Sequence, residues 1–260
     1  MNTNNKSDSI GNDLNCKKIE SIYKKIEDLG GLDNTIKEVK SILGFKKIIA
    51  FSGGGQGIKV NFDDKEIAEK IEEYSTLAKK KIVSDIVSRL RDYDIAILTG
   101  GTKWDIPKIA TEIARGNNIP TIGVYPRRGE KNSVGKDLLN IEVVVDPIYG
   151  ESHFGDESHL FAKLADGMFV LGGGAGTLIE FAHVMKINEA LKKYNGNIKK
   201  IVPISGIPGV SDAVHYIPGN DDIKRLTFPD FIINSGKEAF DWMRKELDLD
   251  DIMKEYRYIF

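Results

Sequence analysis

Three short apolar segments of this chain each end in a cluster of glycines, and this repeated arrangement restricts the possible folds more than any other feature. The clusters follow Phe51, Leu98 and Leu171, and a stretch with helical periodicity begins soon after each of them. Apolar segments such as Ile48–Phe51 and Val143–Val145 show no alternation with polar residues. Parallel strands that helices cover on both faces have this pattern. The chain is therefore predicted to be an α/β protein with a doubly wound parallel sheet and right-handed crossovers.

The periodicity allows the elements of this Rossmann-like fold to be placed. Apolar runs of four or five residues predict strands at Lys47–Phe51, Ile95–Leu98, Thr121–Tyr125, Ile141–Val145, Met168–Leu171 and Lys200–Ile204. Amphipathic stretches predict helices at Leu32–Leu43, Asp64–Leu90, Ile106–Gly116, Glu157–Ala165, Thr177–Tyr194 and Glu238–Leu247. Helices therefore extend the fold at both its N-terminal and its C-terminal side.

The N-terminal region differs from the rest in composition. Residues 1–15 are rich in Asn, Ser, Asp and Lys and are expected to be disordered. Apolar residues recur with helical spacing at Ile19, Ile22, Ile26 and Leu29, which predicts one more helix. We therefore divide the chain into an N-terminal start and helical extension (1–45), a Rossmann-like nucleotide-binding domain (46–235) and a C-terminal helical segment (236–260).

Composition narrows the function classes. Of the 260 residues, 41% are hydrophobic and 29% are charged, as in ordinary globular proteins, and the net charge of −2 favours no nucleic-acid partner. Cys16 is the sole cysteine, so no intrachain disulfide forms. No apolar run has the ~20 residues of a membrane span, and a cytoplasmic protein without membrane contact is expected. The four histidines lack metal-ligand spacing, so we expect no metal site and no cofactor.

Glycine at the carboxyl end of a parallel strand suits a ligand site. It adopts positive φ readily, as expected for Gly174, and it lets a ligand approach the peptide plane closely. The helix that follows directs free N–H groups and the positive end of its dipole at the same point, which favours a phosphate. Because these strand ends share one sheet edge, we predict one nucleotide site. Its residues are Ser52, Gly53, Gly54, Gly100, Gly101, Thr102, Gly172, Gly173, Gly174, Ala175, Gly176 and Thr177.

The spacing of the glycines disfavours two common nucleotide motifs. Gly53–Gly57 does not have the Gly-x-Gly-x-x-Gly register of dinucleotide-binding folds, and no Gly-Lys-Ser/Thr of a P-loop follows. An NAD-dependent dehydrogenase and a P-loop ATPase are therefore disfavoured. The alternative interpretation of the clusters is structural, because glycine is common in any tight turn between a strand and a helix.

Glu180 is the candidate catalytic residue. It follows Thr177 by three residues, in the first turn of the predicted helix. A carboxylate so close to a phosphate site is placed to contact the sugar or to stabilise a developing positive charge. Alternatively, it is an N-terminal acid that stabilises the helix through the macrodipole.

The segment Gly172–Glu180 resembles the Pro-Gly-Gly-x-Gly-Thr-x-x-Glu signature of the Lonely Guy (LOG) family. These proteins are cytokinin-activating nucleoside 5′-monophosphate phosphoribohydrolases, long described as possible lysine decarboxylases, within the SLOG superfamily of Rossmann-like nucleotide-binding proteins. Ala96–Gly101, Pro120–Pro126 and Leu164–Leu171 resemble three further family segments. The resemblance implies a Rossmann-like fold, a nucleotide ligand and a homodimer or higher homo-oligomer.

The chain also departs from the family pattern. Gly172 stands where the signature has proline, and Ile179 stands where it has its first acid, while Glu180 retains the final acid. An Arg-Lys pair that contributes a catalytic arginine in the family corresponds here to Glu157–Ser158. The family arginine is therefore absent.

Other residues are candidates for the missing contacts. Glu157 lies in an acidic segment and is a possible ligand contact at the ribose hydroxyls. Arg127 and Arg128 follow the predicted third strand and are candidates for supplying a cation, Arg128 as a second possible ligand contact. The alternative for both arginines is a solvated position on a loop.

Two functions from different classes remain open. The first is an N-glycosidic hydrolase that holds the 5′-phosphate of a nucleoside monophosphate and releases the base and ribose 5-phosphate. The second is a non-catalytic SLOG-type nucleotide sensor or carrier, which the missing arginine favours. The sequence does not identify the base.

Overall fold

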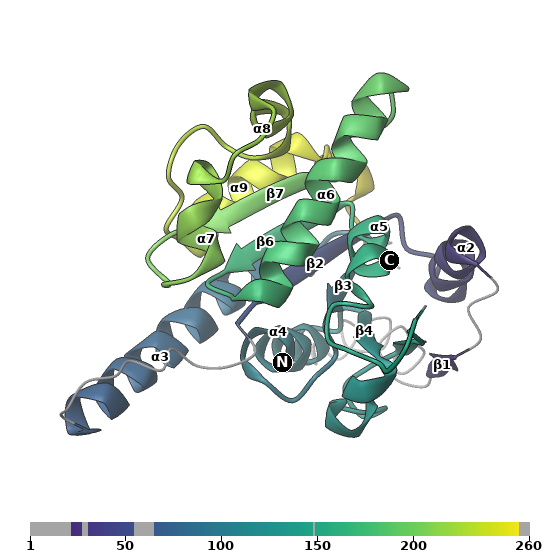
Figure 1. Ribbon diagram of the computed structural model, residues 1–260, viewed down its shortest axis with the longest axis horizontal. Coiled ribbons are helices and arrows are strands. Elements are labelled where there is room, and N and C mark those ends of the chain that lie inside the picture. The colour runs from purple at the N-terminus through teal and green to yellow at the C-terminus, as the bar shows by residue number, and fades with distance from the viewer. Residues whose placement is uncertain (1–21, 28–30, 55–64, 148, 255–260) are drawn as a thin grey trace, which may run out of the picture.

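The computed structural model describes residues 22–27, 31–54, 65–147 and 149–254. Their core is a parallel sheet of seven strands in the order β1-β5-β4-β3-β2-β6-β7 (Figure 1). The strands are β1 (Lys24–Ile26), β2 (Lys47–Gly53), β3 (Ile95–Thr99), β4 (Thr121–Pro126), β5 (Ile141–Val145), β6 (Gly167–Leu171) and β7 (Lys200–Ile204). The order runs outward from β2 in both directions, so β2 and β6 meet where the winding of the sheet reverses. A ligand crevice opens at such a point in open α/β sheets.

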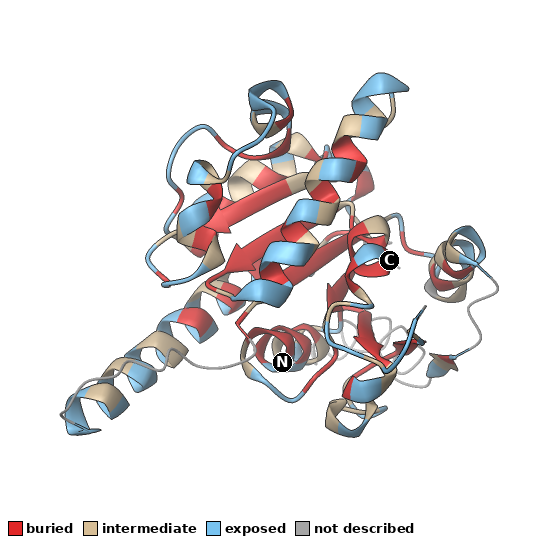
Figure 2. Ribbon diagram, viewed as in Figure 1, coloured by how far each residue is buried: buried red, intermediate tan, exposed pale blue. Residues whose placement is uncertain are grey.

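Helices cover both faces of the sheet, as the apolar strands require. One face packs against α3 (Lys65–Leu90), α4 (Asp105–Gly116) and α9 (Gly236–Glu246), and the other against α2 (Leu32–Leu43), α5 (Ser158–Leu164) and α6 (Ala175–Lys193). The strands between them are almost wholly buried (Figure 2). The shorter elements are α7 (Val210–Ala213), α8 (Asp221–Thr227) and the 3-10 helices η1 (Arg127–Asn132), η2 (Val214–Tyr216) and η3 (Leu249–Ile252).

The predicted fold class is confirmed. All six predicted strands are present, and each begins and ends within two residues of its predicted limits. The six helices predicted from Leu32 onward are present as α2, α3, α4, α5, α6 and α9. In the described ranges, no helix is long and apolar enough to cross a bilayer.

The prediction of a helix through Ile22 and Ile26 is wrong. Lys24–Ile26 is the edge strand β1, which pairs in parallel with β5. The Asn140 side-chain amide donates to the carbonyl oxygen of Ile22 at 3.0 Å, and the Lys24 amide donates to the carbonyl oxygen of Asn140 at 2.9 Å. Long-range backbone pairing therefore overrides the local helical spacing. Residues 1–15, for which disorder was expected, lie outside the described residues.

Asn188 fixes α6 to the rest of the fold. This fully buried side chain donates to the Lys199 carbonyl oxygen at 2.8 Å and to Thr227 Oγ1 at 2.9 Å, and it accepts from the Lys199 amide at 2.9 Å. It thereby joins α6 to the residue before β7 and to α8. The position of α6 matters for function because its N-terminus borders the main pocket.

We expect Asn188→Ala to lower the free energy of unfolding by about 2–3 kcal/mol, because it removes the hydrogen bonds of the Lys199 amide and carbonyl groups and one of the two hydrogen bonds of Thr227 Oγ1. Urea denaturation of the full chain measures this change. Asn197→Ala, at an exposed position nearby, is the matched control and is expected to change stability by less than about 0.5 kcal/mol. Equal effects of the two substitutions would contradict the anchoring role.

Candidate functional site

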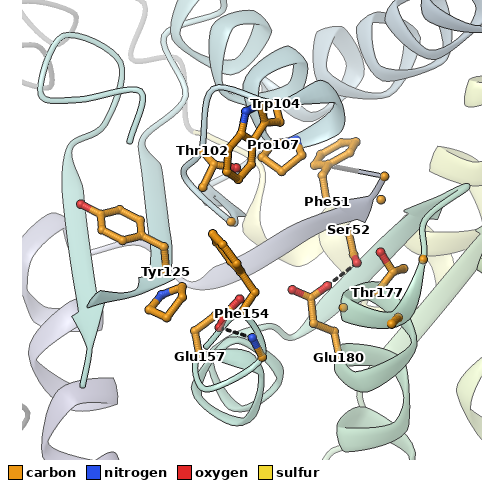
Figure 3. A pocket seen from close by; sticks show the side chains of 18 residues that line it. Phe51, Ser52, Thr102, Trp104, Pro107, Tyr125, Phe154, Glu157, Thr177 and Glu180 are labelled. Atoms are coloured by element: carbon orange, nitrogen blue, oxygen red, sulfur yellow. Dashed lines mark hydrogen bonds between the residues drawn. The ribbon is translucent and has the colours of Figure 1, made fainter. Parts of the chain in front are cut away.

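The main pocket opens at the carboxyl edge of the sheet and has a volume of about 700 Å³ (Figure 3). Its walls come from the ends of β2, β3, β4 and β6 and from the N-terminal ends of α4, α5 and α6. The residues that line it are Phe51, Ser52, Gly53, Gly54, Gly100, Thr102, Trp104, Pro107, Tyr125, Pro126, Phe154, Gly155, Glu157, Gly174, Ala175, Gly176, Thr177 and Glu180.

Most of the residues that the sequence analysis assigned to a ligand site meet here. Ser52, Gly53, Gly54, Gly100, Thr102, Glu157, Glu180 and the segment Gly174–Thr177 line the pocket. Gly101, Gly172, Gly173 and Arg128 do not. The three glycine-ended strands therefore converge on one cavity, while part of each glycine cluster serves the packing behind it.

The turn after β6 separates these two roles. Gly172 and Gly173 have φ values of +62° and +96°, which a side chain disfavours. The Gly172 amide donates to Ser211 Oγ at 2.9 Å, and its carbonyl oxygen accepts from the Ser211 amide at 3.1 Å. A Cβ on Gly209 would approach the Gly173 carbonyl oxygen to 2.6 Å. The loop before α7 thus holds the turn from behind and sets the direction in which α6 begins.

The first turn of α6 forms the pocket wall. Gly174 precedes the helix and gives no side-chain hydrogen bond to its N–H groups. These N–H groups and the positive end of the helix dipole border the cavity, which is the arrangement that binds phosphate at helix N-termini. The expectation of a positive φ at Gly174 is wrong, because its φ is −118°. Nothing lies within 4 Å of a Cβ built at Gly174 or Gly176, so these glycines leave space for a ligand.

Two other glycines allow strand ends to approach closely. A Cβ on Gly53 would lie 2.5 Å from the carbonyl oxygen of Leu171, and one on Gly101 would lie 2.8 Å from Gly123 Cα. Gly53 therefore allows the close contact of β2 with β6, and Gly101 packs against β4. The structural interpretation of glycine applies to Gly101, and the ligand interpretation applies best to the first turn of α6.

Two carboxyl groups lie inside the pocket, on neighbouring helices. Ser52 donates a hydrogen bond from its hydroxyl to Glu180, and the Gly155 amide donates to Glu157 Oε2 at 2.8 Å (Figure 3). Burial and, to a smaller extent, the charge of Glu157 raise the pKa of Glu180 to about 8, against the effect of the Ser52 hydrogen bond. Burial also raises the pKa of Glu157, while backbone hydrogen bonds oppose the increase. At neutral pH Glu180 is thus mainly a neutral hydrogen-bond donor.

Aromatic side chains form the wall opposite α6. The rings of Trp104 and Phe154 meet edge to face, with centroids 5.8 Å apart, and both are partly exposed to the cavity side (Figure 3). The Tyr125 ring is buried, and its hydroxyl donates to Glu142. Aromatic faces at the pocket mouth favour a flat ring in the ligand.

The sequence analysis missed this aromatic wall. Trp104 lies three residues after Gly101, the end of the second glycine cluster, and Phe154 lies three residues before Glu157. Proximity to predicted site residues is the one signal that identifies them from sequence. Their contact with each other joins the segment before α4 to the loop before α5, and no local pattern predicts that contact.

The two candidate arginines lie outside the pocket. Arg127 forms ion pairs with Asp146 at 2.8 Å, with Glu27 and with Glu130. Arg128 is exposed, and its backbone N–H donates to Ser152 Oγ at 3.0 Å. None of the described residues that line the pocket is a lysine or an arginine. Nor do three or more His, Cys, Asp or Glu residues of the described ranges gather as metal ligands would.

An open parallel sheet with a glycine turn and a helix N-terminus at its reversal point defines a Rossmann-like protein with a small-molecule site. Within that class, the match of residues 68–204 to the SLOG cluster4 family covers more than half of the chain, and the protein belongs to this family. The resemblance to the SLOG superfamily is thereby confirmed. No curated protein matches the sequence.

Solved structures with the same fold share little sequence with this chain. TM1055, a structural-genomics target, has a TM-score of 0.54 and 16% identity over 77% of this chain and 99% of its own. The molybdenum cofactor carrier protein of Chlamydomonas reinhardtii has a TM-score of 0.50 and 18% identity over 78% of this chain and 99% of its own. The molybdenum cofactor binding protein of Rippkaea orientalis has a TM-score of 0.50, 16% identity and coverage of 78% and 98%. At these identities the similarity establishes the fold alone.

The raised pKa of Glu180 has a consequence for stability. Between the ordinary pKa of 4.5 and about 8, the folded protein retains a proton that the unfolded chain releases. Stability contributed at this position therefore decreases as the pH rises through that window. Glu180→Gln removes the ionisation, and we expect the free energy of unfolding of the variant relative to wild type to rise by about 2–4 kcal/mol from pH 5 to pH 8.

Urea denaturation at a series of pH values measures this difference. Glu151→Gln, at an exposed position, is the control and is expected to follow the wild-type curve. Parallel curves for Glu180→Gln and wild type would show that Glu180 is ionised at neutral pH in the folded protein.

Proposed function

We propose that this protein binds a small phosphorylated ligand of the nucleotide type in the main pocket. The observation that carries the proposal is the N-terminal turn of α6, whose glycines Gly174 and Gly176 border the cavity with open space above them. Free N–H groups and the helix dipole at such a place attract a phosphate without any cationic side chain. The cavity volume of about 700 Å³ suits a ligand of nucleotide size.

The state of Glu180 is compatible with an anionic ligand. A carboxylate next to a phosphate would repel it, but a pKa of about 8 keeps Glu180 mainly protonated at neutral pH. A protonated carboxyl group donates a hydrogen bond, as the helix N–H groups do. The two donor types then surround the same part of the cavity, while Trp104 and Phe154 provide apolar surface for a ring.

A binding role without turnover is consistent with the similar structures. The proteins from Chlamydomonas reinhardtii and Rippkaea orientalis are described as a carrier and a binding protein for the molybdenum cofactor. For the present chain, the described pocket lining contains no lysine or arginine that could replace the catalytic arginine of the LOG family, which favours binding without turnover. A carrier or sensor role follows most directly from these features.

Titration calorimetry with AMP tests the proposal, with adenosine as the ligand that lacks the phosphate. We expect AMP to bind and adenosine to bind at least about tenfold more weakly, because the α6 contacts need the phosphate. AMP affinity is expected to fall about fivefold or more between pH 7 and pH 9 as Glu180 ionises, and to stay constant over this range in Glu180→Gln. Equal affinities for AMP and adenosine would refute a phosphate site at α6.

The second candidate function is hydrolysis of an N-glycosidic bond, which the two pocket carboxyl groups favour. Paired carboxyl groups in different environments suit an acid and a base. Protonated Glu180 would donate its proton to the departing base, and ionised Glu157 would stabilise positive charge at the ribose C1 and accept a proton from the attacking water. The products would be the free base and ribose 5-phosphate. This assignment differs from the sequence-based one, in which Glu180 itself carries the negative charge.

Incubation with a panel of nucleoside 5′-monophosphates, followed by chromatography for free base, tests the hydrolase. If it acts, Glu180→Gln and Glu157→Gln are each expected to lower kcat by about 10²–10³-fold while AMP affinity at pH 7 changes little. Glu151→Gln is the control and should retain full activity. Saturable AMP binding without any released base would exclude the hydrolase and leave the carrier or sensor function.

A further inference from the structure

A second cleft lies on the other side of Trp104 from the main pocket. It has a volume of about 390 Å³ and runs between α3 and α4, which pack against each other (Figure 1). Trp104 lines both cavities, and Asp105 beside it lines the second one alone. The two cavities are therefore adjacent, with a partly exposed indole ring between them. We name the second cavity the lysine cleft, after Lys79, Lys80, Lys103 and Lys108, which line it.

The charges of the lysine cleft favour an anion. Lys79 and Asp105 form a buried ion pair at 2.6 Å, so the carboxylate of Asp105 is already neutralised. Lys108 lies 3.7 Å from Glu112 in a loose, exposed pair. Lys80 and Lys103 are exposed, and their ammonium groups have no hydrogen-bond or ion-pair partner in the described part of the chain.

Glu72 is the remaining carboxylate of the lysine cleft. Four lysines against the three carboxylates of Glu72, Asp105 and Glu112 leave a net positive charge. The main pocket has two carboxyl groups, of which Glu180 is mainly protonated at neutral pH, and no cation among its described lining residues. The N-terminus of α6 neutralises only part of the charge of a highly anionic ligand. The lysines of the lysine cleft would neutralise the rest.

Ser75 provides an independent sign of a polar ligand there. It lines the lysine cleft, and its buried hydroxyl oxygen has no hydrogen-bond partner among the described residues. Buried hydroxyl groups in folded proteins are normally paired. Rotation of the Ser75 side chain toward the cleft would let a ligand oxygen supply the partner.

We propose that the lysine cleft is a second anion subsite of the ligand site, so that the natural ligand is a nucleotide with two separate phosphate groups. One phosphate binds at the N-terminus of α6, and the other lies past Trp104 near Lys80 and Lys103. This inference rests on the proposed binding of a nucleotide-type ligand in the main pocket, and it specifies the chemical class of that ligand.

Calorimetry with three probes tests the proposal: AMP, adenosine 3′,5′-bisphosphate and adenosine 2′,5′-bisphosphate. The bisphosphates differ from AMP only in the second phosphate. We expect at least one of them to bind about fivefold tighter than AMP or better, the scale of a few exposed ionic contacts. In the double variant Lys80→Gln/Lys103→Gln this preference should disappear while AMP affinity stays within about twofold of wild type.

The matched control is Lys186→Gln/Lys193→Gln, which removes the same charge from exposed positions on α6, outside the lysine cleft. It is expected to retain the preference. If AMP binds and neither bisphosphate binds more tightly, or if the preference survives in Lys80→Gln/Lys103→Gln or is lost equally in the control, the second subsite is refuted and the main site stands. If AMP itself does not bind to wild type, the proposed function fails, and the subsite with it.

Discussion

Parallel pairing of β2 with β6 is the interaction on which the rest of the site depends. The two halves of the sheet extend outward from these two strands. Ser52 and Gly53 lie opposite Val170 and Leu171 at the carboxyl end of the pair. Gly53 permits the approach, because any side chain there would collide with the Leu171 carbonyl oxygen. As a result, the start of α6 and the hydroxyl of Ser52 border the same cavity, and Ser52 reaches Glu180.

The turn between β6 and α6 shows how the fold divides the work of a glycine cluster. Gly172 and Gly173 have positive φ, and Ser211 and the loop before it hold them in place. They therefore set the direction in which α6 leaves the sheet. Gly174 and Gly176 have ordinary or open surroundings and leave room for a ligand. One short segment thus contains the residues that shape the turn and the residues that border the cavity. A side chain at Gly172 or Gly173 would strain the backbone, whereas one at Gly174 or Gly176 would fill the space for a ligand.

Electrostatics in the main pocket differ from those of a typical phosphate site. Among the described residues the pocket lining holds no lysine or arginine, so the proposed phosphate binding relies on backbone N–H groups and on a carboxyl group that remains protonated. The protein can maintain such a carboxyl group only because the fold removes it from water, and this desolvation costs stability as the pH rises. Positive charge is instead concentrated behind Trp104, in the lysine cleft. The proposed ligand site therefore combines a neutral donor region in the main pocket with a separate cationic region in the lysine cleft.

Local sequence patterns predicted the parallel α/β class, six of the seven strands and most residues of the main pocket. Apolar runs, glycine clusters and helical periodicity are local signals, and right-handed crossover connections convert them into a single sheet edge. The resemblance to the SLOG superfamily followed from the same local residues, Gly172–Glu180. Local spacing failed at Ile22 and Ile26, where pairing with β5 imposes a strand.

Only the tertiary structure decided which residues face the cavity and in which protonation state. Trp104 contacts Phe154, and Arg127 forms ion pairs that hold it outside the site, and both features join segments distant in the sequence. The cleft behind Trp104 depends on how α3 packs against α4. The sequence shows that a glutamate stands at position 180, but it does not show the protonation state of this residue. Its pKa of about 8 arises from burial and from Glu157 on another helix. Desolvation and charge coupling depend on the surroundings in space, which a one-dimensional pattern does not contain.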